Sequence, residues 1–432
     1  MAKRKRVLSG MRPTGRLHLG HFFGALANWL KLQQEYDCYF FVADWHALTT
    51  HYEDTSSIAE NTLQVAMDWL AVGLDPEKST LFVQSQVLEH AELHVLLSMI
   101  TPLSWLERVP TYKEQIENLK GRDLGTYGFL GYPLLQSADI VMYGEPEQDL
   151  LVPVGEDQAP HVELTREVVR RFNANFGLQI SNEFFDDKSA LAYFLDLTPS
   201  VRREAYDPYD LVYRQSIHRA AMAKAHESGI ANFLDAMGKH RKYFRYKEIL
   251  REPAYVSTET PRLPGVDGRR MAKSYGNAIW LADPPEEIRK KVLKHMLTDP
   301  QRVRRTDPGR PEICPVFAYH KLFSTPDTVA RVDRDCRTAT IGCVDCKKLM
   351  ADNLVRWIEP IQSKRKEWEE RRDDVWVMLN DGSRKAEAVA RSTMERVRNA
   401  VFHWDDAGKS APGVITPATF RKAKRKIYLE DV

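Results

Sequence analysis

Short apolar runs alternate with helical patterns in the first third of the chain, and this alternation constrains the fold more than any other feature. RVLSG (residues 6–10) precedes apolar residues at helical spacing over 19–35, and CYFFVAD (38–44) is apolar almost throughout. TLFVQS (80–85) and DLLVPVG (149–155) are similar runs. Strands covered on both faces have this composition, and parallel strands need crossover helices between them. The sequence therefore predicts an α/β fold with a Rossmann-like, doubly wound parallel sheet.

The rest of the chain predicts further parts, because 432 residues exceed one ordinary hydrophobic core. We predict an α/β domain at 1–185, a helical insertion without a clear strand at 186–255, a loop and linker at 256–290, and a helical domain at 291–432. Basic and aromatic residues interleave over 239–251 of the insertion. That run fits either a solvated helical appendage or a contact with RNA.

Composition argues against export and against a membrane span. The longest apolar runs are far shorter than the ~20 residues that cross a bilayer. The basic start MAKRKRV lacks the apolar stretch that follows in a signal peptide. Five cysteines, with Cys38 isolated, do not resemble a disulfide framework, which favours a reducing cytoplasm. A net charge of +2 neither supports nor excludes a nucleic-acid partner.

The motif PTGRLHLGH (13–21) lies where the first strand ends and a helix begins. Its glycines allow close approach of the backbone, and a helix start offers free N–H groups to a phosphate. His18 and His21 are three residues apart and share one face of that helix. Alone, such histidines are more often structural than functional.

A second motif, DGRRMAKSYGN (267–277), follows about 250 residues later. It carries Arg269, Arg270 and Lys273 between glycines, as in a loop that brings cations to a polyphosphate. Taken alone, it fits a solvated basic turn better. Together, an HxGH after the first strand and an MxKS loop resemble the two motifs of class I aminoacyl-tRNA synthetases.

Within that class, the chain resembles bacterial tryptophanyl-tRNA synthetases over most of residues 6–185 and 258–400. The matching segments are GMRPTGRLHLGH, FFVADWHALTTHY, ERVPTYKEQ, YPLLQSADIVMY, VPVGEDQAPHVELTREVVRRFN, MAKSYGN and DPQRVRRTDPGRPEICPV. The resemblance implies a tryptophan–tRNA ligase that forms tryptophanyl-adenylate from ATP and transfers tryptophan to tRNA(Trp). A paralogue that binds RNA or a regulatory partner without charging tRNA is the alternative.

The resemblance also implies which residues form the site. Those that would border ATP are Arg12, Pro13, Thr14, Gly20, His21, Gly155, Glu156, Asp157, Met271, Lys273 and Ser274. Of the motif residues, Thr14, His18, His21 and Lys273 would be catalytic. Mg²⁺ is implied by the polyphosphate, held mostly through phosphate oxygens and water.

For tryptophan, Asp139 resembles the family's acceptor for the indole N–H, while Tyr132 and Gln158 match residues near the substrate ammonium. A helix-capping role is the other interpretation of Asp139. The chain departs from the family where RMAKS replaces KMSKS, so that Arg270 and Ala272 leave the hydrogen bonds of that loop in question.

The remaining cysteines are spaced C-x21-C-x6-C-x2-C, at Cys314, Cys336, Cys343 and Cys346. Four thiolates suit tetrahedral zinc or an iron–sulfur cluster, and the residues alone favour zinc. This region resembles a subset of the family that carries a [4Fe–4S] cluster, so we rank the cluster first, zinc second and free buried thiols third. An iron–sulfur redox sensor is a further alternative for the function.

Partners follow from the same resemblance. It implies tRNA(Trp), L-tryptophan and ATP, with residues 291–432 reading the anticodon beside the cysteines. It also implies a homodimer in the cytoplasm.

Overall fold

The computed structural model describes residues 4–110, 112, 125–155, 159–199, 211–257 and 263–402. The chain divides into two compact units. Unit 1 contains Met1–Gln86, Pro153–Gln158 and Val256–Ala386, and unit 2 contains Val87–Val152, Ala159–Tyr255 and Glu387–Val432. No helix among the described residues is long and apolar enough to cross a membrane.

A five-stranded sheet with the order β3-β2-β1-β4-β7 confirms the predicted α/β class. β1 (Arg6–Met11) runs parallel to β2 (Asp37–Val42), and β2 runs parallel to β3 (Ser79–Val83). β4 (Leu150–Val154) and β7 (Ala254–Ser257) are the strands in which the chain passes from one unit to the other. The four strands expected from apolar runs are present, and β7 is an addition.

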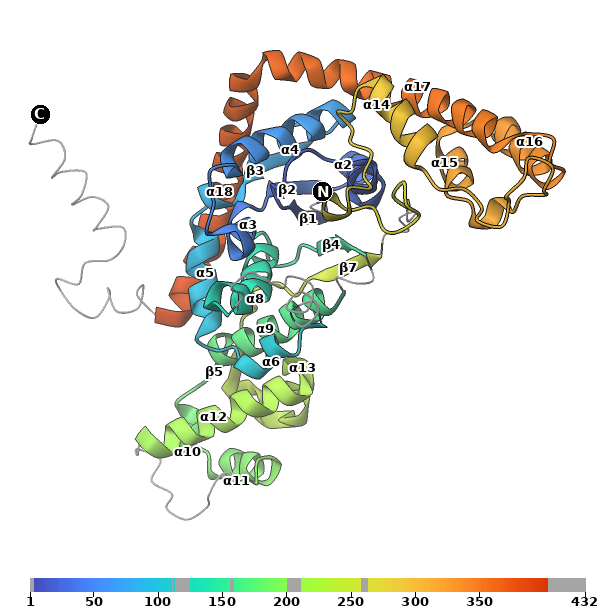
Figure 1. The fold of residues 1–432 in the computed structure, drawn as a ribbon. Helices are drawn as coiled ribbons and strands as arrows, with labels where there is room; N and C mark the ends of the chain where they lie inside the picture. The colour runs from blue at the N-terminus through green and yellow to red at the C-terminus, as the bar shows by residue number, and fades with distance from the viewer. Residues whose placement is uncertain are drawn as a thin grey trace, which may run out of the picture. The chain divides into compact units, whose positions relative to one another are not determined.

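Unit 1 begins with helical segments that follow β1, β2 and β3 (Figure 1). A π-helical turn, η1, interrupts the first predicted helix, which otherwise spans the expected residues. These elements are α1 (Leu19–His21), η1 (Phe22–Leu26), α2 (Ala27–Glu35), α3 (Asp44–His51), α4 (Ile58–Val72) and η2 (Gln84–Gln86). Trp29 of α2 stacks on Phe40 of β2, with ring centroids 4.3 Å apart, and both are buried in the core of this unit.

The later part of unit 1 is helical, as predicted after Pro284. The longest helix that lies wholly in it, α17, packs against α4, α14 and α15 (Figure 1). The elements are η5 (Lys273–Tyr275), α14 (Pro285–Lys290), η6 (Lys291–His295), η7 (Pro311–Ile313), α15 (Pro315–Phe323), α16 (Pro326–Arg337) and α17 (Cys343–Glu370). α18 (Arg372–Phe402) begins in unit 1 and continues into unit 2.

Unit 2 contains two groups of helices. The first comprises α5 (Glu89–Ser98), α6 (Leu103–Glu107), α8 (Tyr127–Met142) and α9 (Ala159–Gly177), of which α8 packs against the other three. The second contains β5 (Leu178–Ile180), α10 (Glu183–Asp186), α11 (Lys188–Leu197), α12 (Leu211–Ser228), α13 (Ile230–Ala236), η4 (Gly238–Tyr243) and β6 (Phe244–Tyr246).

This second group has an apolar core of its own, built around Phe184, Phe194, Phe233 and Phe244. Asp187 caps α11 by accepting the N–H groups of two residues in its first turn. The expectation of no clear strand between 186 and 255 was wrong, because β6 pairs antiparallel with β5 over three residues. So short a strand has no visible period in the sequence.

Candidate active site

The two signature segments meet in unit 1, although about 250 residues separate them in the chain. Lys273 donates its Nζ proton to the carbonyl oxygen of Thr14 at 3.0 Å. The N–H of Gly20 lies 3.4 Å from the Sδ atom of Met271. The backbone also joins the segments, since Leu19 donates its N–H to Ile279 at 3.0 Å. The structure therefore brings together the predicted residues Thr14, Gly20, Met271 and Lys273.

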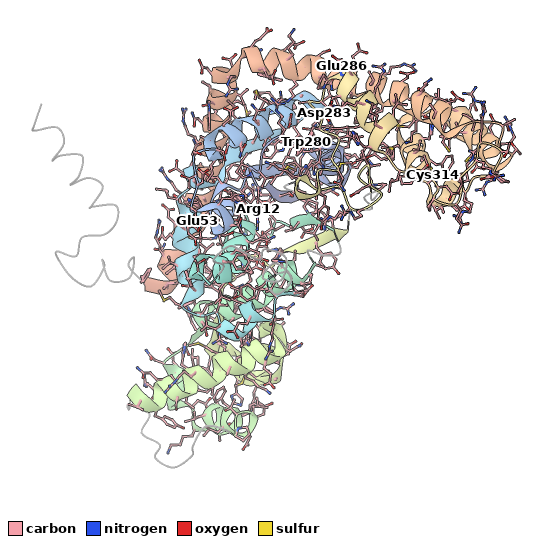
Figure 2. All side chains as sticks on the ribbon, viewed as in Figure 1. Arg12, Glu53, Trp280, Asp283, Glu286 and Cys314 are labelled. Carbon is pink, nitrogen blue, oxygen red and sulfur yellow. The ribbon has the colours of Figure 1, made fainter. Side chains whose placement is uncertain are left out.

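The loop after β1 has a backbone that few side chains would tolerate. Gly15 has φ +110°, in the left-handed region that favours glycine. A Cβ atom on Gly20 would lie 2.9 Å from the imidazole of His18, closer than real Cβ contacts. Arg12 and Pro13 precede this turn at the carboxyl end of β1, where Figure 2 labels Arg12. Ligands of open parallel sheets bind at this end of the strands.

The motif histidines form a close pair of neutral rings. Their centroids are 3.7 Å apart, and the backbone N–H of His18 donates to Nδ1 of His21 at 3.2 Å. Burial and the nearby Arg270 lower the pKa of His18 to about 4. Burial, His18 and Arg270 lower the pKa of His21 to about 3. Neither imidazole is charged at neutral pH.

One atom of this pair indicates a ligand. Nδ1 of His18 is buried and has no hydrogen-bond partner among the described residues. A buried polar atom without a partner is costly, and ligands commonly satisfy such atoms at functional sites. A phosphate or hydroxyl group entering the loop would supply the missing partner.

Asn277 holds the second signature loop in place. Its Nδ2 group donates to the carboxylate of Asp267 at 2.7 Å and to the carbonyl of Arg270 at 3.0 Å. Its Oδ1 atom accepts the N–H of Ala272 at 2.9 Å. The departures at Arg270 and Ala272 therefore leave a hydrogen-bonded loop, because Asn277 bonds to the backbone of both. The side chain of Ser274 lies outside the described residues.

Gly155 directly follows β4, at the carboxyl end of that strand. The other predicted residues of this segment, Glu156, Asp157 and Gln158, lie outside the described residues. Their roles remain predictions.

Asp139, the predicted indole acceptor, lies in the interior of α8 in unit 2 and is 1% exposed. A helix-capping role is therefore wrong, because α8 continues to Met142. His90 of α5 places Nδ1 2.6 Å from Oδ1 of Asp139 and Nε2 2.7 Å from the hydroxyl of Tyr143. Tyr132, the predicted residue near the substrate ammonium, is buried on the same helix.

His90, Tyr143 and Asn277 are residues that the sequence did not single out. With Nδ1–H donating to the Asp139 carboxylate, Nε2 of His90 accepts the hydroxyl proton of Tyr143, so the three side chains form one hydrogen-bonded chain. His90 is 49 residues from Asp139 in sequence and belongs to no motif. Asn277 ends the second motif, but nothing in its spacing marked it as the residue that organises the loop.

The four predicted metal ligands come from neighbouring elements of unit 1, and Figure 2 labels Cys314 well apart from Arg12. Cys314 precedes α15, Cys336 lies in α16, and Cys343 and Cys346 lie in the first turn of α17. All four thiols are half-buried and free of disulfides. Burial, with the other three thiols adding to it, raises the pKa of Cys346 to about 12.

The surroundings of Cys336 are tight. Nη1 of Arg302 donates to its Sγ atom at 3.7 Å, and a Cβ atom on Gly309 would lie 2.5 Å from that sulfur. Among the described residues, no three His, Cys, Asp or Glu side chains are grouped closely enough to hold a metal ion. The thiols interact electrostatically with one another nonetheless.

Comparisons with known proteins agree with this geometry. A family model described as tRNA synthetases class I (W and Y) matches residues 1–193 and 237–358. A tryptophan–tRNA ligase of Ralstonia nicotianae is 47% identical over 405 residues, which cover 92% of this chain and 98% of that protein. One from Thermotoga maritima is 44% identical over 398 residues, with 92% and 98% covered.

Among solved structures, the fold is similar to a tryptophanyl-tRNA synthetase from Campylobacter jejuni complexed with ADP and tryptophan. The TM-score is 0.67 at 25% identity, and the match covers 92% of this chain and 99% of that one. The family model leaves residues 194–236 unmatched, and these lie within the predicted insertion.

Proposed function

Because the chain belongs to the class I tRNA synthetases of the tryptophan and tyrosine group, we infer that it is a tryptophan–tRNA ligase. The carboxylate of tryptophan attacks the α-phosphate of ATP, which gives tryptophanyl-adenylate and pyrophosphate. A hydroxyl of the terminal adenosine of tRNA(Trp) then accepts the tryptophanyl group. Neither step needs a covalent bond to the protein, so the chain acts by positioning and by stabilising charge.

The observation that carries this function is the contact between the two signature segments. Negative charge moves to the leaving pyrophosphate as the α-phosphate bond breaks, and a nearby ammonium stabilises that charge. Lys273 is exposed and reaches the loop of Thr14, while Arg270 interacts with both motif histidines. His18 and His21 are neutral, so they can hydrogen-bond to the phosphates but add no positive charge. Mg²⁺ would be held by phosphate oxygens and water beside these groups.

Selection of tryptophan rests on Asp139. Indole has a single polar hydrogen, so a buried carboxylate that accepts it selects tryptophan over side chains that lack a donor there. A site built around one such hydrogen bond rejects analogues by about 10⁴-fold or more. Tyr132 and Gln158 would contact the substrate ammonium.

Tryptophan-dependent exchange of pyrophosphate into ATP tests this function. We expect exchange with tryptophan and at least about 10⁴-fold lower kcat/KM with tyrosine. Asp139→Asn keeps the shape of the side chain and should lower kcat/KM for tryptophan while KM for ATP stays unchanged. Absence of exchange with every amino acid would instead identify a paralogue that does not charge tRNA.

The four cysteines are proposed to hold a [4Fe–4S] cluster rather than zinc. Cys314 directly before α15, Cys336 of α16, and Cys343 and Cys346 of α17 are free thiols that influence one another electrostatically. Their region resembles the cluster-bearing subset of the family, and this resemblance supports the cluster. Bound there, it would cross-link the three helices, with Arg302 donating to the Cys336 sulfur.

Colour and metal content distinguish a [4Fe–4S] cluster from zinc. Protein purified without oxygen should be brown, with iron and sulfide in equal amounts, and Cys336→Ser should be colourless. A colourless, zinc-loaded wild-type protein would refute the cluster.

Residues 291–432 are proposed to read the anticodon, as the family resemblance implies, in the cytoplasm where tRNA and ATP are available. The basic surface of η4 and β6 is a proposed second contact with RNA. Lys239, Arg241 and Arg245 are exposed there. Exchanging Lys239 and Arg245 for glutamate should weaken tRNA binding without changing pyrophosphate exchange. Equal tRNA affinity would leave this surface as a solvated appendage.

The homodimer is proposed to form through α5 and α6 of unit 2. Leu88, Val95, Met99 and Leu103 are between 50% and 75% exposed, and Tyr127 of α8 is 59% exposed. Large apolar side chains gathered in this way usually mark an interface. Val95→Glu should convert a dimer to a monomer in sedimentation experiments, whereas a wild-type monomer at micromolar concentration would refute the assignment.

A further inference from the structure

A buried carboxylate connects the first signature segment to the long helix α17 within unit 1. Asp68, in the middle of α4, is 0% exposed. Its Oδ2 atom accepts the backbone N–H of Leu17 at 2.8 Å, and its Oδ1 atom accepts Nε–H of Arg365 at 2.6 Å. Arg365 is 3% exposed and lies on α17. The pKa of Asp68 is raised overall, because the effect of burial exceeds the opposing effects of Arg365 and the Leu17 N–H.

The N–H that Asp68 accepts belongs to the peptide between Arg16 and Leu17, and Leu17 directly precedes His18. Leu17 lies in neither a helix nor a strand of the sheet, so its buried N–H needs a partner from elsewhere in the fold. On the other side, the carbonyl of Leu17 accepts the N–H of Leu281 at 2.9 Å. The position of His18 is thus set by Asp68 and by the backbone that follows the second signature loop.

The same stretch of α17 also contacts that second backbone. Nε2 of Gln362 donates to the carbonyl of Leu281 at 3.1 Å and to the carbonyl of Asp283 at 2.6 Å. Figure 2 labels Trp280 and Asp283 close together beneath this helix. Gln362 and Arg365 are three residues apart and therefore share one face of α17.

Arg365 is itself held firmly. Its two terminal nitrogens donate to Gln64 of α4 and to Glu369 one turn later on α17. Every donor-bearing nitrogen of the guanidinium therefore has an acceptor, which fixes the fork in one orientation. A lysine at this position would supply the charge without that geometry.

We propose that Arg365 and Gln362 are positioning residues for ATP activation, which hold Leu17 of the first signature segment in place relative to the backbone of residues 281–283 that follows the second. Arg365 acts through Asp68 on the Leu17 peptide, and Gln362 acts directly on the carbonyls of Leu281 and Asp283. This role rests on the proposed function. It extends the catalytic arrangement to a helix whose first turn carries two of the four cysteines.

The alternative is a purely structural ion pair between α4 and α17. Loss of such a pair lowers the fraction of folded protein and leaves each folded site unchanged. Loss of a positioning residue changes KM or kcat per folded site, because the loop that receives ATP is displaced. Titrating active sites by the burst of tryptophanyl-adenylate counts the folded sites and separates the two cases.

The experiment compares Arg365→Met, Arg365→Lys and Gln362→Met in full-length protein. Per titrated site, Arg365→Met should lower kcat/KM for ATP by about 30-fold or more, and Gln362→Met by about threefold to tenfold. KM for tryptophan should change less than about twofold. Arg365→Lys should recover part of the stability but little of the loss in kcat/KM.

Asp352→Asn is the matched control, because it breaks an exposed ion pair between α17 and Arg289 of α14. Asp352→Asn should leave kcat/KM for ATP and KM for tryptophan unchanged. If Arg365→Met does not fold, Gln362→Met decides, since it removes no charge. Wild-type constants per site in Gln362→Met and in every folded Arg365 variant would overturn the positioning role, whereas wild-type protein without exchange would overturn the proposed function instead.

Discussion

The bond between His90 and Asp139 offers a sharp test of how tryptophan is selected. Both side chains are almost wholly buried, and their polar atoms are 2.6 Å apart. His90→Phe keeps a planar ring and removes both hydrogen bonds of the imidazole. A hydrogen bond to a charged group contributes about 1.5–3 kcal/mol. We therefore expect kcat/KM for tryptophan to fall about 10-fold to 150-fold.

The assay is pyrophosphate exchange with tryptophan and with β-(3-benzothienyl)alanine, which lacks the ring N–H. Wild-type protein should prefer tryptophan strongly, and His90→Phe should lose much of that preference because Asp139 loses its hydrogen bond to His90. Tyr143→Phe is the graded control. It removes a neutral hydrogen bond worth about 0.5–1.5 kcal/mol, so its loss should be about tenfold at most. Unchanged KM and unchanged preference in folded His90→Phe would refute this account of Asp139.

Three further predictions concern the other parts of the site. Lys273→Ala should lower kcat for adenylate formation by about 10²-fold to 10³-fold, with the KM for tryptophan unchanged, as measured by single-turnover kinetics. The pKa of His18 is about 4 in the folded protein and near 6.5 when unfolded, so its contribution to stability is present above pH 6.5 and is lost as the pH falls toward 4. The free energy of unfolding, measured with urea, should therefore fall less between pH 7 and pH 5 in His18→Asn than in wild-type protein. Gly309→Ala should displace the Cys336 thiol and bleach the brown colour, whereas Gly24→Ala, which meets no atom within 4 Å, should retain it.

The sequence predicted the parts of the fold that depend on local composition. Apolar runs located β1, β2, β3 and β4 to within one or two residues, because strands buried on both faces contain few polar positions. The π-helical turn at Phe22–Leu26 was not visible, since the apolar spacing around it is still helical. β6 and β7 are short and carry polar residues, so no period marked them.

The candidate site was also predicted only in part. Residues inside a motif, such as His18 and Lys273, were predicted from the sequence, and the structure brings their segments together. Residues that support the motifs from distant parts of the chain were not predicted. His90 lies in an ordinary helix, and Arg365 is one of several charged residues in SKRKEWEERR. Only the packing of α17 on α4 distinguishes Arg365 from its exposed neighbours, and contacts 297 residues apart leave no local pattern.

Charging of tRNA(Trp) is the measurement that tests the central claim most directly. Purified protein, ATP, Mg²⁺ and radiolabelled tryptophan should yield tryptophanyl-tRNA at a rate of about 1 s⁻¹ or faster, as enzymes of ordinary turnover do. Lys273→Ala and Asp139→Asn should reduce that rate steeply, and labelled tyrosine should not be transferred. Protein that forms no tryptophanyl-tRNA under these conditions, or that charges tyrosine equally well, would contradict the assignment.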